Sequence, residues 1–148
     1  MVTPFGSVLK RVISVVRKGS QEDDRINWGC SVIGCPSYIE LMEYRLKQSG
    51  LPVDPPHLPP SFLRVLERDD PGTIFRQTKE IPASLKRKNI LVLSGKEDVL
   101  VPWTASNTFI TALQEQSQSI EVKVYPGVGH EFVPIMAKDF HVWLLKFL

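Results

Sequence analysis

Hydrophobic residues divide the second half of the chain into alternating strand-like and helix-like segments. The continuous apolar run at residues 90–93 is typical of a strand that is covered on both faces. Apolar and polar residues alternate at 120–125, which predicts a second strand. Helical spacing marks 103–116, and Pro134 suits the first turn of a helix that runs to about the end of the chain. This order predicts an α/β layered fold with a parallel sheet.

The first half of the chain begins with an amphipathic segment. Apolar residues of 1–18 share one arc of a helical wheel and basic residues share the opposite arc, so we expect a helix followed by a loop to about residue 25. Residues 26–34 then predict a buried strand.

Turn and capping signals organise residues 37–72. Ser37 and Glu40 match the capping box S-x-x-E, which predicts the start of a helix that ends at Gly50. The dense prolines of 51–60 predict a stiff extended linker. A short helix at 61–68 and a turn at 69–72 are expected to follow.

Bulk properties exclude several function classes. A length of 148 residues fits one domain with its own core, and a net charge of +2 is too small to indicate a nucleic-acid partner. No apolar run is long enough to span a bilayer, so we expect no membrane partner. Cys30 and Cys35 are too few for a four-ligand metal site, and we expect free thiols, no metal and no cofactor.

The basic N-terminal segment leaves two cellular locations open. Packed on the domain surface, it fits a cytoplasmic protein. Its lack of acidic residues before Glu22 is equally the profile of a mitochondrial presequence.

Two short segments near the C-terminus carry the candidate chemistry. One reads Gly-Lys-Glu-Asp-Val-Leu-Val-Pro and contains Asp98, and the other reads Gly-Val-Gly-His and ends at His130. Each follows a predicted strand. A carboxylate at the end of one strand and an imidazole at the end of a later one suit the orientation and use of a general base. The sequence contains no G-x-S-x-G nucleophile turn.

These segments resemble the C-terminal part of an α/β-hydrolase, with closest similarity to dienelactone-hydrolase and prolyl-oligopeptidase-like serine hydrolases. In that superfamily a Gly-x-x-Asp turn carries the triad acid, and a later Gly-x-Gly-His turn carries the triad histidine. The resemblance implies that Asp98 accepts the Nδ1 proton of His130. It also implies that His130 serves first as general base and then as general acid.

The resemblance also implies a domain organisation. Residues 1–148 would form a single partial α/β-hydrolase domain, with an amphipathic helix and loop at 1–25. Residues 38–85 would be a cap-like insertion, and 86–148 would be the half that bears the acid and the histidine. The N-terminal strands, the oxyanion loop and the nucleophile elbow of the superfamily have no counterpart in this sequence.

No other residue is a convincing nucleophile or base. Ser31 lies in a motif one residue too long for an elbow and inside a predicted strand, and the capping box accounts for Ser37. Cys35 would make a chemically reasonable Cys-His-Asp set, but no neighbouring residue is expected to lower its thiol pKa. His57 and His141 lack any comparable context.

Two functional hypotheses follow. In the first, the chain is a serine-hydrolase fragment for ester, thioester or peptide bonds. It would be inactive alone unless a missing half or another chain supplies the nucleophile. In the second, it is a non-catalytic α/β domain that binds a protein or a ligand. An unpaired sheet edge would then favour a homodimer or a partner chain.

Overall fold

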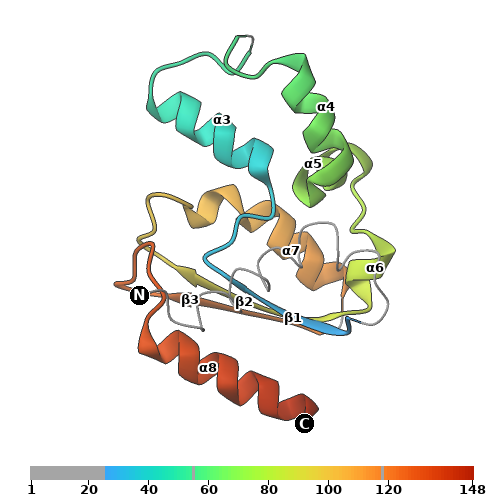
Figure 1. The fold of residues 1–148 in the computed structure, drawn as a ribbon, viewed down its shortest axis with the longest axis vertical. Helices are drawn as coiled ribbons and strands as arrows, with labels where there is room; N and C mark the ends of the chain where they lie inside the picture. Colours follow the sequence, from blue (N-terminus) through green and yellow to red (C-terminus); the bar gives the residue numbers. More distant parts are fainter. Residues whose placement is uncertain (1–25, 55, 118) are drawn as a thin grey trace, which may run out of the picture.

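The computed structural model describes residues 26–54, 56–117 and 119–148, so the amphipathic helix and loop predicted at 1–25 lie outside the described residues. In the described part, helices separate the strands along the chain (Figure 1). In chain order they are β1 (Trp28–Val32), α3 (Tyr38–Gln48), α4 (Pro60–Asp69), α5 (Pro71–Thr78), α6 (Ala83–Lys86), β2 (Asn89–Gly95), η2 (Trp103–Ala105), α7 (Asn107–Gln116), β3 (Ile120–Tyr125), α8 (Pro134–Leu144) and η3 (Leu145–Phe147).

The three described strands form one parallel sheet in the order β1-β2-β3. Val32 pairs with Leu93, and Gly95 pairs with Tyr125, so the three strands end close to one another. In Figure 1, α8 lies on one face of the sheet and α7 on the other. This arrangement confirms the predicted α/β layered fold with a parallel sheet.

Side chains of β2 alternate between two apolar cores. Leu91 and Leu93 pack with Met136 and Trp143 of α8 on one face. Ile90 and Val92 pack on the other face with residues of α6 and α7. The continuous apolar run of the sequence is therefore that of a central strand covered on both faces, as predicted.

Helices α3 and α4 stand apart from the sheet and have a small core of their own. Ile39, Leu58 and Leu66 are buried together, and partly buried apolar residues of both helices pack around them. In Figure 1 this layer lies above α7, on the face of the sheet away from α8. We call α3, α4 and α5, with their connections, the upper layer.

The capping box predicted at Ser37 is wrong. Ser37 precedes α3, but its side chain caps nothing, and its buried Oγ has no hydrogen-bond partner. The acceptor comes instead from Asp70, whose Oδ1 accepts from the Tyr38 N–H at 3.0 Å. A distant carboxylate therefore accepts from the first N–H of α3, which is not one of the two donors of a capping box.

The turn predicted at 69–72 is wrong as well, because the chain passes from α4 into α5 there. Asp70 is the N-cap of α5, and its Oδ2 accepts from the Thr73 N–H at 3.0 Å and from Thr73 Oγ1 at 2.6 Å. Pro71 occupies the first helical position, where proline is well tolerated. One buried carboxylate therefore caps both α3 and α5.

Across the residues that the structure describes, no helix combines the length and the apolar character needed to cross a bilayer.

We expect Asp70→Ala to lower the free energy of unfolding by about 2 to 4 kcal/mol, because two helix starts lose their acceptor at a buried site. Urea denaturation followed by circular dichroism measures the change. Glu67→Ala is the matched control, since Glu67 is an exposed residue of α4 whose carboxylate accepts a long 3.4 Å hydrogen bond from Gln77 Nε2. Equal losses in the two variants would contradict this role for Asp70.

Candidate active site

The loops that follow β2 and β3 lie side by side at the carboxyl end of the sheet (Figure 1). The first loop carries Asp98 and the second carries His130. The structure brings these two predicted residues together, with 2.9 Å between His130 Nδ1 and Asp98 Oδ2. Ligand sites of parallel α/β sheets characteristically form at this end of the strands.

Asp98 is held from both of its oxygens. Oδ1 accepts hydrogen bonds from the backbone N–H groups of Leu100 at 2.9 Å and Val101 at 2.8 Å. Oδ2 faces His130. Its side chain is fully buried, whereas that of His130 is 41% exposed. The buried carboxylate thus has a fixed orientation, and it presents one oxygen to a ring that solvent can reach.

This pair sets the direction in which the imidazole can act. A neutral ring whose Nδ1–H donates to Asp98 carries its free lone pair on Nε2. Among the described residues, no group hydrogen-bonds to Nε2. Such an arrangement can orient an imidazole as a base, with Nε2 as the nitrogen that would take the proton.

The two loops are held together by their backbones. The Lys96 N–H donates to the Tyr125 carbonyl, and the Glu97 N–H donates to the Val128 carbonyl, both at 3.0 Å. A Cβ added at Gly95 would lie 2.3 Å from the Gly129 carbonyl oxygen. Only a glycine permits this approach without backbone movement, so Gly95 contributes to the meeting of Asp98 and His130.

Glu97 is a member of the site that the sequence reasoning passed over. Its exposed carboxylate accepts a hydrogen bond from the Gly127 N–H, with 2.7 Å between Gly127 N and Glu97 Oε2. Gly127 has a positive φ of 75°, a conformation that glycine adopts without strain. The sequence showed the glycines of this turn, Gly127 and Gly129. It did not show that Glu97 accepts a hydrogen bond from the turn.

Comparisons with known proteins show which family and folds this chain resembles. Residues 72–139, which include Asp98 and His130, match the model of the dienelactone hydrolase family. The structure also resembles TT1662 from Thermus thermophilus, with a TM-score of 0.55 and 19% sequence identity over 93% of this chain and 49% of that chain. A comparison with curated protein sequences finds no match.

Two further solved structures have the same similarity in fold. Pyrococcus furiosus esterase Pf2001 has a TM-score of 0.55 and 13% identity over 91% of this chain and 49% of that chain. Pyrococcus horikoshii acylaminoacyl peptidase has a TM-score of 0.55 and 14% identity over 86% of this chain and 20% of that chain. The chain has the fold of the C-terminal part of an α/β-hydrolase. It spans half or less of the length of these three structures.

The serines considered as nucleophiles are poorly placed within this α/β-hydrolase fold. Ser31 lies within β1, in the strand itself. Ser37 is fully buried, so no substrate can reach its hydroxyl without movement of the upper layer. Neither serine hydrogen-bonds to His130.

Cys35 is also unsuited to nucleophilic attack. Its half-buried thiol donates a hydrogen bond to the Ser37 carbonyl at 3.1 Å. Burial raises the pKa of the Cys35 thiol, and hydrogen bonds with the Ser37 backbone and the Ser106 side chain offset only part of this effect. The protonated form of a thiol is a weak nucleophile.

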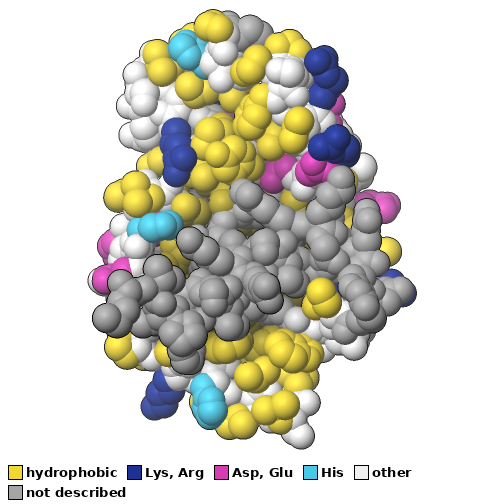
Figure 2. Space-filling model, viewed as in Figure 1, with side chains coloured by type: hydrophobic (Ala, Val, Ile, Leu, Met, Phe, Trp, Pro, Cys, Tyr) yellow, Lys and Arg dark blue, Asp and Glu magenta, His cyan; other side chains and the backbone are white. Residues whose placement is uncertain are grey.

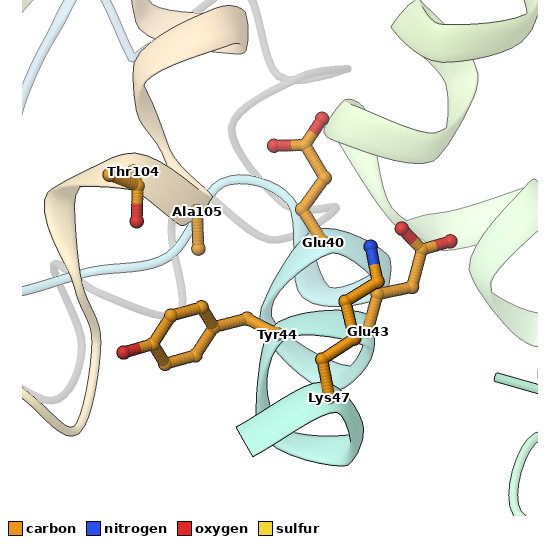
Figure 3. Close-up of a pocket in the computed structure, with 6 residues that line it drawn as sticks. All are labelled: Glu40, Glu43, Tyr44, Lys47, Thr104 and Ala105. Atoms are coloured by element: carbon orange, nitrogen blue, oxygen red, sulfur yellow. The ribbon is translucent and has the colours of Figure 1, made fainter. Parts of the chain in front are cut away.

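A cavity of about 270 Å³ lies between α3 and η2 (Figure 3). It is lined by Glu40, Glu43, Tyr44 and Lys47 from α3 and by Thr104 and Ala105 from η2. Burial raises the pKa of the Glu40 carboxyl. Neither Asp98 nor His130 lines this cavity, so it is separate from the acid–histidine pair. In the described ranges, no cluster of three His, Cys, Asp or Glu side chains is arranged to hold a metal ion.

We expect both thiols to react slowly with iodoacetamide in the folded protein at pH 8. Burial raises the pKa of the Cys30 thiol to about 12, so Cys30 should be at least about a hundredfold slower than in the unfolded chain. Cys35 should be slowed less, since it is only half-buried. Peptide mass spectrometry after timed alkylation measures both rates, with the urea-unfolded chain as reference. Rapid native alkylation of Cys35 would reinstate it as a candidate nucleophile.

Proposed function

We propose that this chain carries the acid and the histidine of a serine hydrolase that cleaves an ester, thioester or peptide bond. The supporting observation is the 2.9 Å contact between His130 Nδ1 and the fully buried carboxylate of Asp98. A surface histidine in an ordinary turn has no need of a buried carboxylate partner. The family match and the esterase and peptidase relatives agree with the same reaction class.

The proposed roles follow from the orientation of the ring. His130 Nε2 would accept the proton of a serine hydroxyl as that oxygen attacks the carbonyl carbon of the substrate. The same nitrogen would then return the proton to the leaving group, and water would release the acyl-enzyme by the reverse sequence of transfers. Asp98 would hold the tautomer and stabilise the imidazolium that forms.

The serine is proposed to come from outside the described residues. No described serine or cysteine hydrogen-bonds to His130, and the sequence has no G-x-S-x-G turn. We therefore propose that the chain alone has negligible hydrolytic activity. A missing N-terminal half or a partner chain would complete the site and bind the small-molecule ester or peptide.

Residues 38–85 are proposed to form a cap over that site. The upper layer has a core of its own, as expected of an insertion that folds on top of the sheet. It also touches the acid loop directly, because Arg45 Nη2 donates to the Leu100 carbonyl at 2.9 Å. Residues 86–148 would then be the part that bears the acid and the histidine.

A non-catalytic binding module is the second candidate, and the free edge of β1 favours it. Within the described part of the chain, β1 has a strand partner on one side only, and Trp28 on this strand is 45% exposed. Hydrophobic side chains also gather at the bottom of Figure 2. In this C-terminal part of the chain, Ile135 and Val142 of α8 and Leu145 of η3 are exposed. A second copy or a partner chain would cover these surfaces.

The cytoplasm is the proposed location, because two free thiols fit a reducing compartment. The mitochondrial alternative depends on residues 1–25. A fluorescent reporter fused to those residues distinguishes the two.

We expect a fluorophosphonate probe to leave the folded chain unlabelled, because no described serine hydrogen-bonds to His130 and the sequence has no nucleophile turn. Labelling is read by gel fluorescence and mapped by peptide mass spectrometry. An intact serine esterase of the same fold is the positive control, and a His130→Ala variant of this chain is the matched negative control.

Labelling of the wild-type chain that disappears in His130→Ala would contradict the proposed inactivity, and the mapped residue would be the nucleophile. To test the acid–histidine pair itself, proton NMR should show a strongly deshielded His130 Nδ1–H that Asp98→Asn removes. Its absence from the folded wild type would favour the binding module.

A further inference from the structure

Glu97, in the loop after β2, makes two hydrogen bonds to the loop after β3. Glu97 donates its backbone N–H to the Val128 carbonyl at 3.0 Å. Its side-chain Oε2 accepts from the Gly127 N–H at 2.7 Å. These bonds fix the turn at two points, Gly127 and Val128, immediately before His130.

The neighbouring carboxylates of Glu97 and Asp98 bind different parts of the second loop. The side chain of Asp98 is buried and meets the imidazole, whereas Glu97 is exposed and meets the backbone of the turn that leads to it. A donor–acceptor distance of 2.7 Å is typical of the short, strong hydrogen bonds that a carboxylate accepts. Glu97 therefore bonds the backbone of the turn that leads to His130, whereas Asp98 bonds the ring.

Gly95 shows why the position of this turn matters. An added Cβ there would lie 2.3 Å from the Gly129 carbonyl oxygen and 2.4 Å from that of Val128. The two loops are thus in direct backbone contact on the side of Gly95, which limits their approach. The backbone contact at Gly95 keeps the two loops from moving closer together. The hydrogen bond from the Gly127 N–H to the Glu97 carboxylate keeps them from moving apart.

We propose that Glu97 is a positioning residue that holds the 126–129 turn so that His130 Nδ1 stays bonded to Asp98. This inference rests on the proposed function for its significance in catalysis. Without the carboxylate, the turn keeps its backbone bond to Val128 but loses its fixed point at Gly127. The imidazole would then sample positions in which Asp98 no longer orients it.

The test compares variants that separate the hydrogen bond from the charge. Glu97→Gln removes the charge but keeps a side-chain oxygen, whereas Glu97→Ala removes both. Glu131→Gln is the matched charge control, because Glu131 is an exposed neighbour of His130 with no hydrogen bond or ion pair to a described residue. Glu97→Asp keeps the charge but shortens its reach, and it replaces Glu97→Ala if that variant does not fold.

NMR of the full ¹⁵N-labelled chain supplies three readouts. They are the His130 Nδ1–H resonance, the titration of the His130 ring and the hydrogen exchange rate of the Gly127 amide. In Glu97→Ala, Gly127 exchange should rise about tenfold, as expected for loss of one hydrogen bond to a charged group. The Nδ1–H resonance should broaden or disappear, while Glu97→Gln and Glu131→Gln should retain it.

Several outcomes would overturn the proposal. If Glu97→Ala retains the wild-type Nδ1–H resonance, Glu97 does not position His130. If Glu97→Ala, Glu97→Gln and Glu131→Gln shift the ring titration equally, Glu97 acts on His130 through its charge alone and does not position the ring. A wild-type chain that lacks the Asp98-dependent resonance would instead contradict the acid–histidine pair, and this result is distinct from a failure at Glu97.

Discussion

The buried carboxylate of Asp98 is the interaction on which the carboxyl end of the sheet depends. A carboxylate removed from water is strongly unfavourable unless its lone pairs are satisfied. Here two backbone N–H groups and one imidazole satisfy them. The backbone donors come from the loop of Asp98 itself, so this loop must curl around its own side chain. The remaining oxygen can then face only the loop after β3.

Contacts around this carboxylate extend in two directions. On one side, Gly95 and Glu97 join the acid loop to the histidine loop. On the other side, Arg45 of α3 donates to the carbonyl of Leu100, whose own N–H is bound by Asp98. The upper layer is therefore attached to the loop that carries Asp98. A displacement of α3 would therefore strain or break a bond to this loop.

The sequence was most informative where local chemistry determines the structure. The apolar run of β2, the alternation in β3 and the glycine turn before His130 each predicted an element that the structure contains. The capping box at Ser37 does not form, and the side-chain acceptor at the start of α3 is Asp70, which binds the Tyr38 N–H from 32 residues later. Glu97 was missed for the same reason, since its partner Gly127 lies 30 residues away. A local motif cannot reveal a hydrogen-bond partner that lies far away along the chain.

The connection between β1 and β2 has a consequence for how the chain folds. These neighbouring strands pair in parallel, yet residues 33–88 separate them and include the whole upper layer. Pairing across so long a connection requires closure of a large loop, which slows folding. The small core of Ile39, Leu58 and Leu66 lies within this connection, and its formation would bring the two ends of the loop closer together. If α3 and α4 associate early, the effective loop contracts before β1 finds β2, so the upper layer would serve as a folding nucleus for the sheet beneath it.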